Sequence, residues 1–127
     1  MNPLTLEWVK KAEDDFAAAE QLMRARKRPV YDAVCFHSQQ CVEKYLKARL
    51  QQAEIEIPRT HDLSAILDYI LPIEPFWEAY RPALRLLSTY AVEYRYPGET
   101  ADKHDAKSAL KICKQIRALV RESLGLR

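Results

Sequence analysis

Apolar residues recur along this chain at intervals of three and four positions, the spacing that places side chains on one face of an α-helix. The pattern predicts a first helix over residues 3–26 and a second over about residues 30–51. Asn2 is placed to cap the first helix, with Pro3 at its first position, and Pro29 separates the two segments. The core stripe expected for the first helix consists of Trp8, Ala12, Phe16, Ala19 and Met23.

Two further helical segments follow an extended connection. The first covers about residues 61–71, with Thr60 as its expected N-cap. Its apolar face is formed by Leu63, Ile66, Leu67, Ile70 and Leu71. The next covers residues 76–96, where Pro82 predicts either a kink or a short helix followed by a new one.

The last helix is expected over about residues 101–124, with Thr100 as its N-cap and Gly125 as its C-terminal cap. No alternating strand pattern, internal repeat or linker interrupts the helical segments. Four long helices and one short helix with short connections predict an all-α fold, an antiparallel up-and-down helical bundle. The length of 127 residues fits one such domain, residues 1–127, around one core.

The composition is that of a helix-rich protein, with 30% charged residues, 48% hydrophobic residues and only two glycines. A glycine loop that cradles phosphate is thereby excluded, so any nucleotide has to be held by side chains. The net charge of +2 is too small to indicate a partner. The three cysteines lie at apolar helical positions, which predicts reduced core thiols. With no apolar run long enough to span a membrane and no signal peptide expected, we predict a cytoplasmic protein.

The second helix carries the most unusual group of polar side chains. His37, Gln40 and Lys44 are spaced i, i+3, i+7 and therefore share one face beside an apolar seam, with Lys47 one turn further on. Near the end of the fourth segment, Arg95 is the best candidate for an anion contact, because its planar fork suits phosphate. On the second helix, His37 and Cys41 have the spacing of metal ligands. No Cys-x-x-Cys or His-Glu-x-x-His motif accompanies them. We therefore expect no metal and no cofactor.

Basic side chains gather in two places. One face of the last helix carries Lys103, Lys107, Lys111, Lys114, Arg117 and Arg121. The end of the first helix carries Arg24, Arg26, Lys27 and Arg28. Either group could contact phosphate. Alternatively, the first group is an ordinary solvated helix face and the second complements the dipole at the end of its helix.

Four segments in order along the chain resemble the HEPN family (Higher Eukaryotes and Prokaryotes Nucleotide-binding). They are Trp8 with Ala12 and Asp15, the run from Phe36-His37-Ser38-Gln39-Gln40 to Glu43-Lys44 and Lys47-Ala48, Thr60-His61-Asp62-Leu63, and Tyr94-Arg95-Tyr96-Pro97. The resemblance implies a helical bundle that forms a homodimer and binds a nucleotide or RNA. It also implies a minimal nucleotidyltransferase as partner protein, in a two-component system of the toxin–antitoxin kind.

The ligand site that follows from this resemblance is a groove lined by the second helix and the fourth segment. The residues expected to bind phosphate are Lys44, Lys47 and Arg95. The residues expected to orient the ligand or to stack on it are His37, Gln40 and Tyr96.

Two alternatives stay open. In the first, the same surface has no catalytic role and docks the partner protein. In the second, the protein cleaves RNA without a metal, using Arg95 with His104 or His37. Eight residues separate Arg95 from His104, a longer interval than in the cleaving members of the family. Such a reaction needs a base near the 2′-hydroxyl and a cation near the charge that develops on the phosphate.

Overall fold

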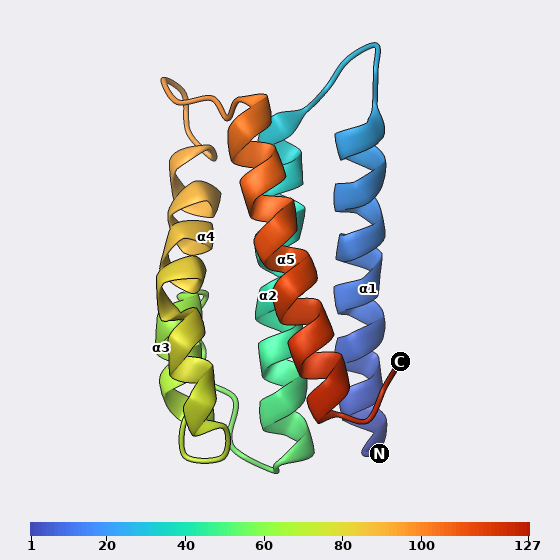
Figure 1. Ribbon diagram of the computed structural model, residues 1–127, viewed down its shortest axis with the longest axis vertical. Helices are drawn as coiled ribbons and strands as arrows, with labels where there is room; N and C mark the ends of the chain where they lie inside the picture. Colours follow the sequence, from blue (N-terminus) through green and yellow to red (C-terminus); the bar gives the residue numbers. More distant parts are fainter.

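The computed structural model describes all 127 residues as five α-helices and one 3-10 helix, without a β-strand. The elements are α1 (Pro3–Arg24), α2 (Tyr31–Gln52), α3 (Leu63–Ile70), η1 (Pro75–Tyr80), α4 (Arg81–Glu93) and α5 (Lys103–Ser123). Figure 1 shows α1, α2, α4 and α5 running alternately up and down, with both chain termini at the same end. The predicted all-α antiparallel bundle is confirmed. None of its helices is both long and apolar enough to cross a membrane.

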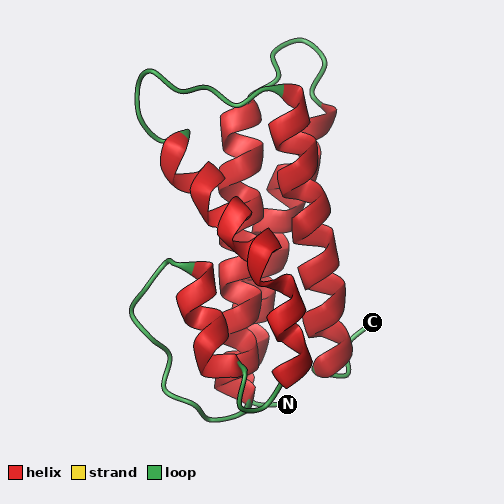
Figure 2. Cartoon of the chain, turned by 60° about the vertical axis from the view of Figure 1, so that its left-hand side comes forward, coloured by secondary structure: helices red, strands yellow, loops and turns green.

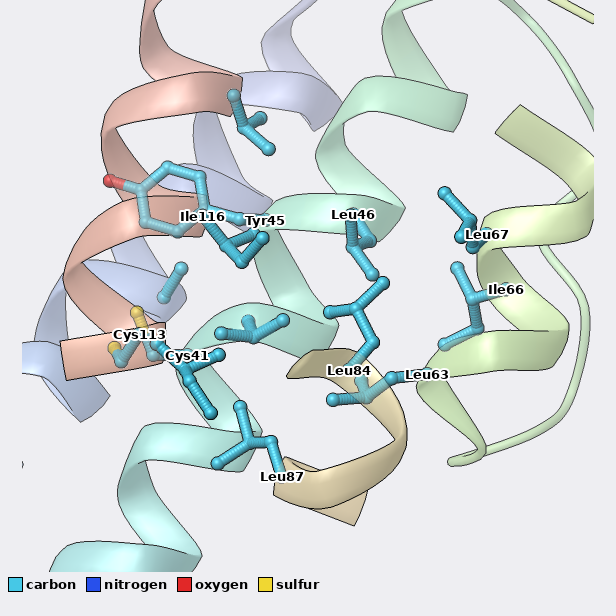
Figure 3. Close-up of a cluster of buried hydrophobic side chains, with 14 of the residues drawn as sticks. Cys41, Tyr45, Leu46, Leu63, Ile66, Leu67, Leu84, Leu87, Cys113 and Ile116 are labelled. Atoms are coloured by element: carbon cyan, nitrogen blue, oxygen red, sulfur yellow. The ribbon is translucent and has the colours of Figure 1, made fainter. Parts of the chain in front are cut away.

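Helix α2 forms the centre of the bundle, because it packs against α1, α3, α4 and α5. Figure 3 shows its core side chains meeting those of three other helices. The labelled side chains are Cys41, Tyr45, Leu46, Leu63, Ile66, Leu67, Leu84, Leu87, Cys113 and Ile116. All three cysteines are buried free thiols, as predicted, and burial raises the pKa of Cys35 to about 12.

The N-caps of two helices differ from the prediction. Helix α3 is capped by Asp62 rather than Thr60, because the Asp62 carboxylate accepts hydrogen bonds from the amides of Ser64 and Ala65. Helix α5 is capped by Asp102 rather than Thr100. There Asp102 accepts from the amide of Asp105, and the Asp105 side chain accepts in return from the amide of Asp102. In both cases an aspartate two residues further on supplies the cap.

The segment around Pro82 follows the second of the two predicted alternatives. The short helix η1 comes first, and α4 then begins at Arg81 with Pro82 in its first turn, where a missing amide hydrogen costs no helical bond. Helix α4 ends at Glu93, so Arg95 lies in the loop to α5. Gly125 has φ 75°, the left-handed conformation expected after the end of a helix. Figure 2 shows that the loops lie at the two ends of the bundle and along one flank.

Candidate functional site

A groove of about 950 Å³ lies between α2, the start of α3 and α4. We call it the α2–α4 groove. Its lining residues are Phe36, Gln39, Gln40, His61, Asp62, Ser64, Arg85, Ser88, Thr89, Ala91, Val92, Glu93 and Arg95. Only three of these thirteen side chains are hydrophobic, so the groove suits a polar ligand more than an apolar one.

Two arginines line the groove, and neither forms an ion pair. Arg85 is exposed on α4. Arg95 is exposed in the loop after α4, and its guanidinium carbon lies 5.9 Å from the centroid of the Phe36 ring. Two acids also line the groove, but the Asp62 carboxylate is occupied as the cap of α3. The other acid, Glu93, is exposed and forms no ion pair, so no carboxylate binds either guanidinium group and both can meet an anionic ligand.

A buried polar network around Glu43, which is only 4% exposed, adjoins the groove through Gln39 and His61. Glu43 accepts hydrogen bonds from Gln39 at 3.1 Å and from the ammonium of Lys47 at 2.9 Å. The Nδ1 atom of His61, whose ring is exposed in the groove, lies 3.0 Å from the Glu43 carboxylate. Burial raises the pKa of Glu43, but these hydrogen bonds outweigh burial and hold the pKa below its usual value of 4.5.

A second carboxylate, that of Asp15 on α1, binds two of the predicted site residues. Its Oδ1 atom lies 2.8 Å from Nδ1 of His37, and its Oδ2 atom accepts from the ammonium of Lys44 at 2.5 Å. Asp15 is 9% exposed, whereas the side chains of His37 and Lys44 are 31% and 24% exposed. This cluster ties α1 to α2 and leaves the other imidazole nitrogen of His37 without a protein partner.

The structure brings some of the predicted ligand residues together and separates others. Gln40 and Arg95 line the same groove, and Gln40 donates to the side chain of Gln39 at 2.8 Å. His37 borders the groove, because its ring centroid is 5.3 Å from that of Phe36. Lys44 and Lys47 do not line the groove, since the carboxylates of Asp15 and Glu43 hold them elsewhere.

The last two predicted residues lie outside the groove lining. Tyr96 is 62% exposed in the loop after α4, and His104 is exposed in the first turn of α5.

Sequence reasoning missed Arg85, Ser88 and Thr89. Their spacing of three and four positions on α4 is the signal that could have revealed a polar stripe there. No group of three His, Cys, Asp or Glu side chains is arranged to hold a metal ion.

Comparison with known proteins identifies the family. The family model of the HEPN domain matches residues 5–123 of this chain. The chain is 32% identical to the "Putative toxin MJ1304" of Methanocaldococcus jannaschii, over 94% of this chain and 90% of that protein. Among solved structures, TT1696 from Thermus thermophilus has the same fold, with a TM-score of 0.79, 24% identity, and coverage of 93% of this chain and 96% of that one. The archaeal HEPN homologue ST0689 superposes with a TM-score of 0.75 and 26% identity, over 94% and 96% of the two chains. The protein therefore belongs to the HEPN domain family.

Proposed function

We propose that this chain is a HEPN protein of the toxin type that binds a nucleotide or a single-stranded segment of RNA in the α2–α4 groove. The observation that carries the proposal is the pair of unpaired guanidinium groups, those of Arg85 and Arg95, in one polar groove. A guanidinium binds phosphate through two parallel hydrogen bonds. The toxin name of the Methanocaldococcus jannaschii relative supports the biological part of the proposal.

The groove also offers contacts for a base and a sugar. Phe36 is 36% exposed, so a base can stack on its ring. The guanidinium of Arg95 lies beside the same ring, close to where the phosphate of that base would be. Gln40 supplies an amide, and the hydroxyls of Ser88 and Thr89 supply hydrogen-bond partners for the sugar. In this assignment Lys44 and Lys47 stabilise the helix packing rather than binding phosphate.

Replacing both groove arginines in an Arg85→Gln/Arg95→Gln variant is expected to weaken the binding of a short fluorescein-labelled oligouridylate. Each lost hydrogen bond to a charged group contributes about 1.5 kcal/mol, so each substitution lowers the affinity about tenfold. Fluorescence anisotropy at constant salt measures the affinity. Lys10→Gln/Lys11→Gln removes the same two charges from exposed positions of α1 and is the control. An unchanged affinity in the double variant would overturn the groove assignment.

The same RNA, incubated with the protein in EDTA and run on a denaturing gel, separates binding from cleavage. His37 and Arg95 both border the Phe36 ring, which favours His37 over His104 as the base. His37 would take the proton of a 2′-hydroxyl, whose oxygen attacks the adjacent phosphorus. The 5′-oxygen then leaves with a proton from water while Arg95 stabilises the phosphate charge. An intact strand identifies a binding protein, and a shortened strand identifies a ribonuclease.

We further propose that the chain forms a homodimer and works with a minimal nucleotidyltransferase. The family resemblance supports this pairing, and so do exposed apolar side chains near the groove, Val92 at 64% and Tyr96 at 62%. A partner docked there would cover the groove.

We expect light scattering to give the mass of a dimer for the chain alone, and a nucleotidyltransferase to co-purify with the tagged chain from host cells. A monomer without such a partner would contradict this proposal.

A further inference from the structure

Helices α1 and α5 lie side by side (Figure 1), and two acids of α1 pair with three cations of α5 along their seam. Glu13 of α1 accepts hydrogen bonds from Nε and Nη2 of Arg117 at 2.7 and 2.8 Å, and Arg121 lies 3.9 Å away. Further up the seam, Glu20 pairs with Lys114 at 3.7 Å. Three of the six cations on this face of α5 thus have an acid of α1 as partner.

After Glu20, the rest of α1 and the connection to α2 contain no acid. The next seam residue of α1 after Glu20 is Met23, which lines a shallow pocket of about 430 Å³ together with Lys107 and Lys111 of α5. The chain then continues directly into a run of basic residues. We call six exposed cations without an ion pair the basic seam: Arg24, Arg26, Lys27 and Arg28 at and after the end of α1, and Lys107 and Lys111 of α5.

The helix dipoles account for only part of the basic seam, because Arg24 alone lies in the last turn of its helix. Helix α1 ends at Arg24, so the three basic residues that follow lie beyond its last turn and do not complement its dipole. Lys107 and Lys111 lie in the second and third turns of α5, too far from its C-terminal end for the dipole to favour a cation there. The helix dipoles therefore do not explain the positions of Lys107 and Lys111.

None of the acids at this end of the bundle forms an ion pair with the basic seam. The carboxylate of Asp32 accepts from the amide of Ala101, and Asp102 caps α5. Asp105 accepts from the amide of Asp102 and from the hydroxyl of Tyr94, which faces α5 from the loop after α4. Glu99 is exposed in the loop before α5 and forms no ion pair, so the seam cations have no carboxylate as direct partner and an external anion can reach them.

We infer that the basic seam binds the phosphate backbone of single-stranded RNA, as a contact surface separate from the α2–α4 groove. Lys107 and Lys111 are one turn apart, a rise of about 6 Å, so neighbouring phosphates of an extended strand can each meet one ammonium. The inference goes beyond the proposed function, because α1 and α4 lie on opposite flanks of α2 and α5 (Figure 1).

An RNA backbone fits the seam better than an acidic protein does. Protein interfaces are rich in exposed aromatic and large apolar side chains and poor in lysine. The strongly exposed aromatic residues of this chain, Phe76, Tyr69 and Tyr96, are not part of the seam. A surface made of lysine and arginine side chains attracts negative charge and does not require a partner of one particular shape. A phosphate backbone can bind to such a surface.

The test is the salt dependence of oligouridylate binding, measured by anisotropy between about 50 and 200 mM potassium chloride. Removing two phosphate contacts with Lys107→Gln/Lys111→Gln is expected to reduce the slope of log K against log salt by about 1.4, since each contact to a single strand contributes about 0.7. Lys10→Gln/Lys11→Gln removes the same charge from exposed positions of α1 outside the seam and is expected to leave the slope unchanged. Circular dichroism checks that both variants remain folded.

Equal slopes in the seam variant and its control would overturn the inference. If the groove variant Arg85→Gln/Arg95→Gln loses affinity while the seam variant keeps its slope, the proposed function stands and the seam assignment fails. The reverse result supports the seam and removes the groove. Polyglutamate that binds as tightly as RNA at equal salt, and that also depends on Lys107 and Lys111, would point to an acidic protein partner and overturn the RNA assignment.

Discussion

Glu43→Gln is expected to lower the free energy of unfolding by about 3–5 kcal/mol. The Glu43 side chain is 5% exposed and that of Lys47 is 10% exposed, so the substitution leaves an ammonium in the interior without a countercharge. It also weakens the acceptor for Gln39 and His61, which hold the end of the α2–α3 connection against α2. Urea unfolding followed by circular dichroism measures the loss.

Two further variants make this expectation specific. Glu20→Gln breaks a more exposed ion pair, 3.7 Å from Lys114, and should cost less than about 1 kcal/mol. Glu43→Leu/Lys47→Met removes both buried charges and should recover much of the stability lost in Glu43→Gln, because no unpaired charge remains. A loss below about 1 kcal/mol in Glu43→Gln would show that Lys47 finds water or another partner.

The buried pair also gives stability a pH dependence with a definite sign. Since the pKa of Glu43 in the folded protein lies below its usual value of 4.5, the carboxylate contributes stability above that pH and loses it as the pH falls further. Glu13 acts in the same direction, because hydrogen bonding to Arg117 lowers its pKa as well. Glu43→Gln should therefore show a smaller, though not absent, loss of stability below pH 4.5 than the parent protein.

Leu67→Ala is expected to cost about 3 kcal/mol of unfolding free energy. Leu67 is fully buried on α3, a helix of only eight residues whose apolar face holds it against α2 and α4. The substitution leaves a cavity that loosens the packing of α3. This helix and its N-cap place Ser64 and Asp62 in the lining of the groove. Unfolding in guanidinium chloride measures the cost.

The matched control is Leu6→Ala on α1, the same substitution at a side chain that is 48% exposed. It should cost less than about 1 kcal/mol, because little apolar surface is returned to water and no cavity forms. Equal losses in the two variants would mean that α3 packs more loosely than its burial indicates.

The helices could be predicted because their signal is local. The apolar positions of α3 recur at intervals of three and four, and four of the five expected core residues are fully buried. The caps were harder to assign. Thr60 and Asp62 can both cap a helix, and the choice depends on which amide hydrogens the backbone presents, which the sequence does not reveal.

The candidate site was only partly predictable for a related reason. Helical spacing correctly placed Gln40 beside the apolar seam of α2, and the planar fork singled out Arg95; both line the groove. Spacing could not reveal that Lys44 faces Asp15, 29 positions earlier in the chain. A helical pattern tells which side chains share a face, whereas the carboxylate opposite them comes from another helix.

Because both termini emerge at the same end of the bundle and the basic seam lies toward the other, an attachment at either terminus is remote from the seam (Figure 1). A chain anchored to a biosensor chip through a terminal affinity tag would present the α1–α2 connection outward, open to long polyanions in the flowing solution. A fused reporter protein would likewise leave that pole unobstructed. The same chain could therefore be labelled, immobilised or fused without masking the surface under test.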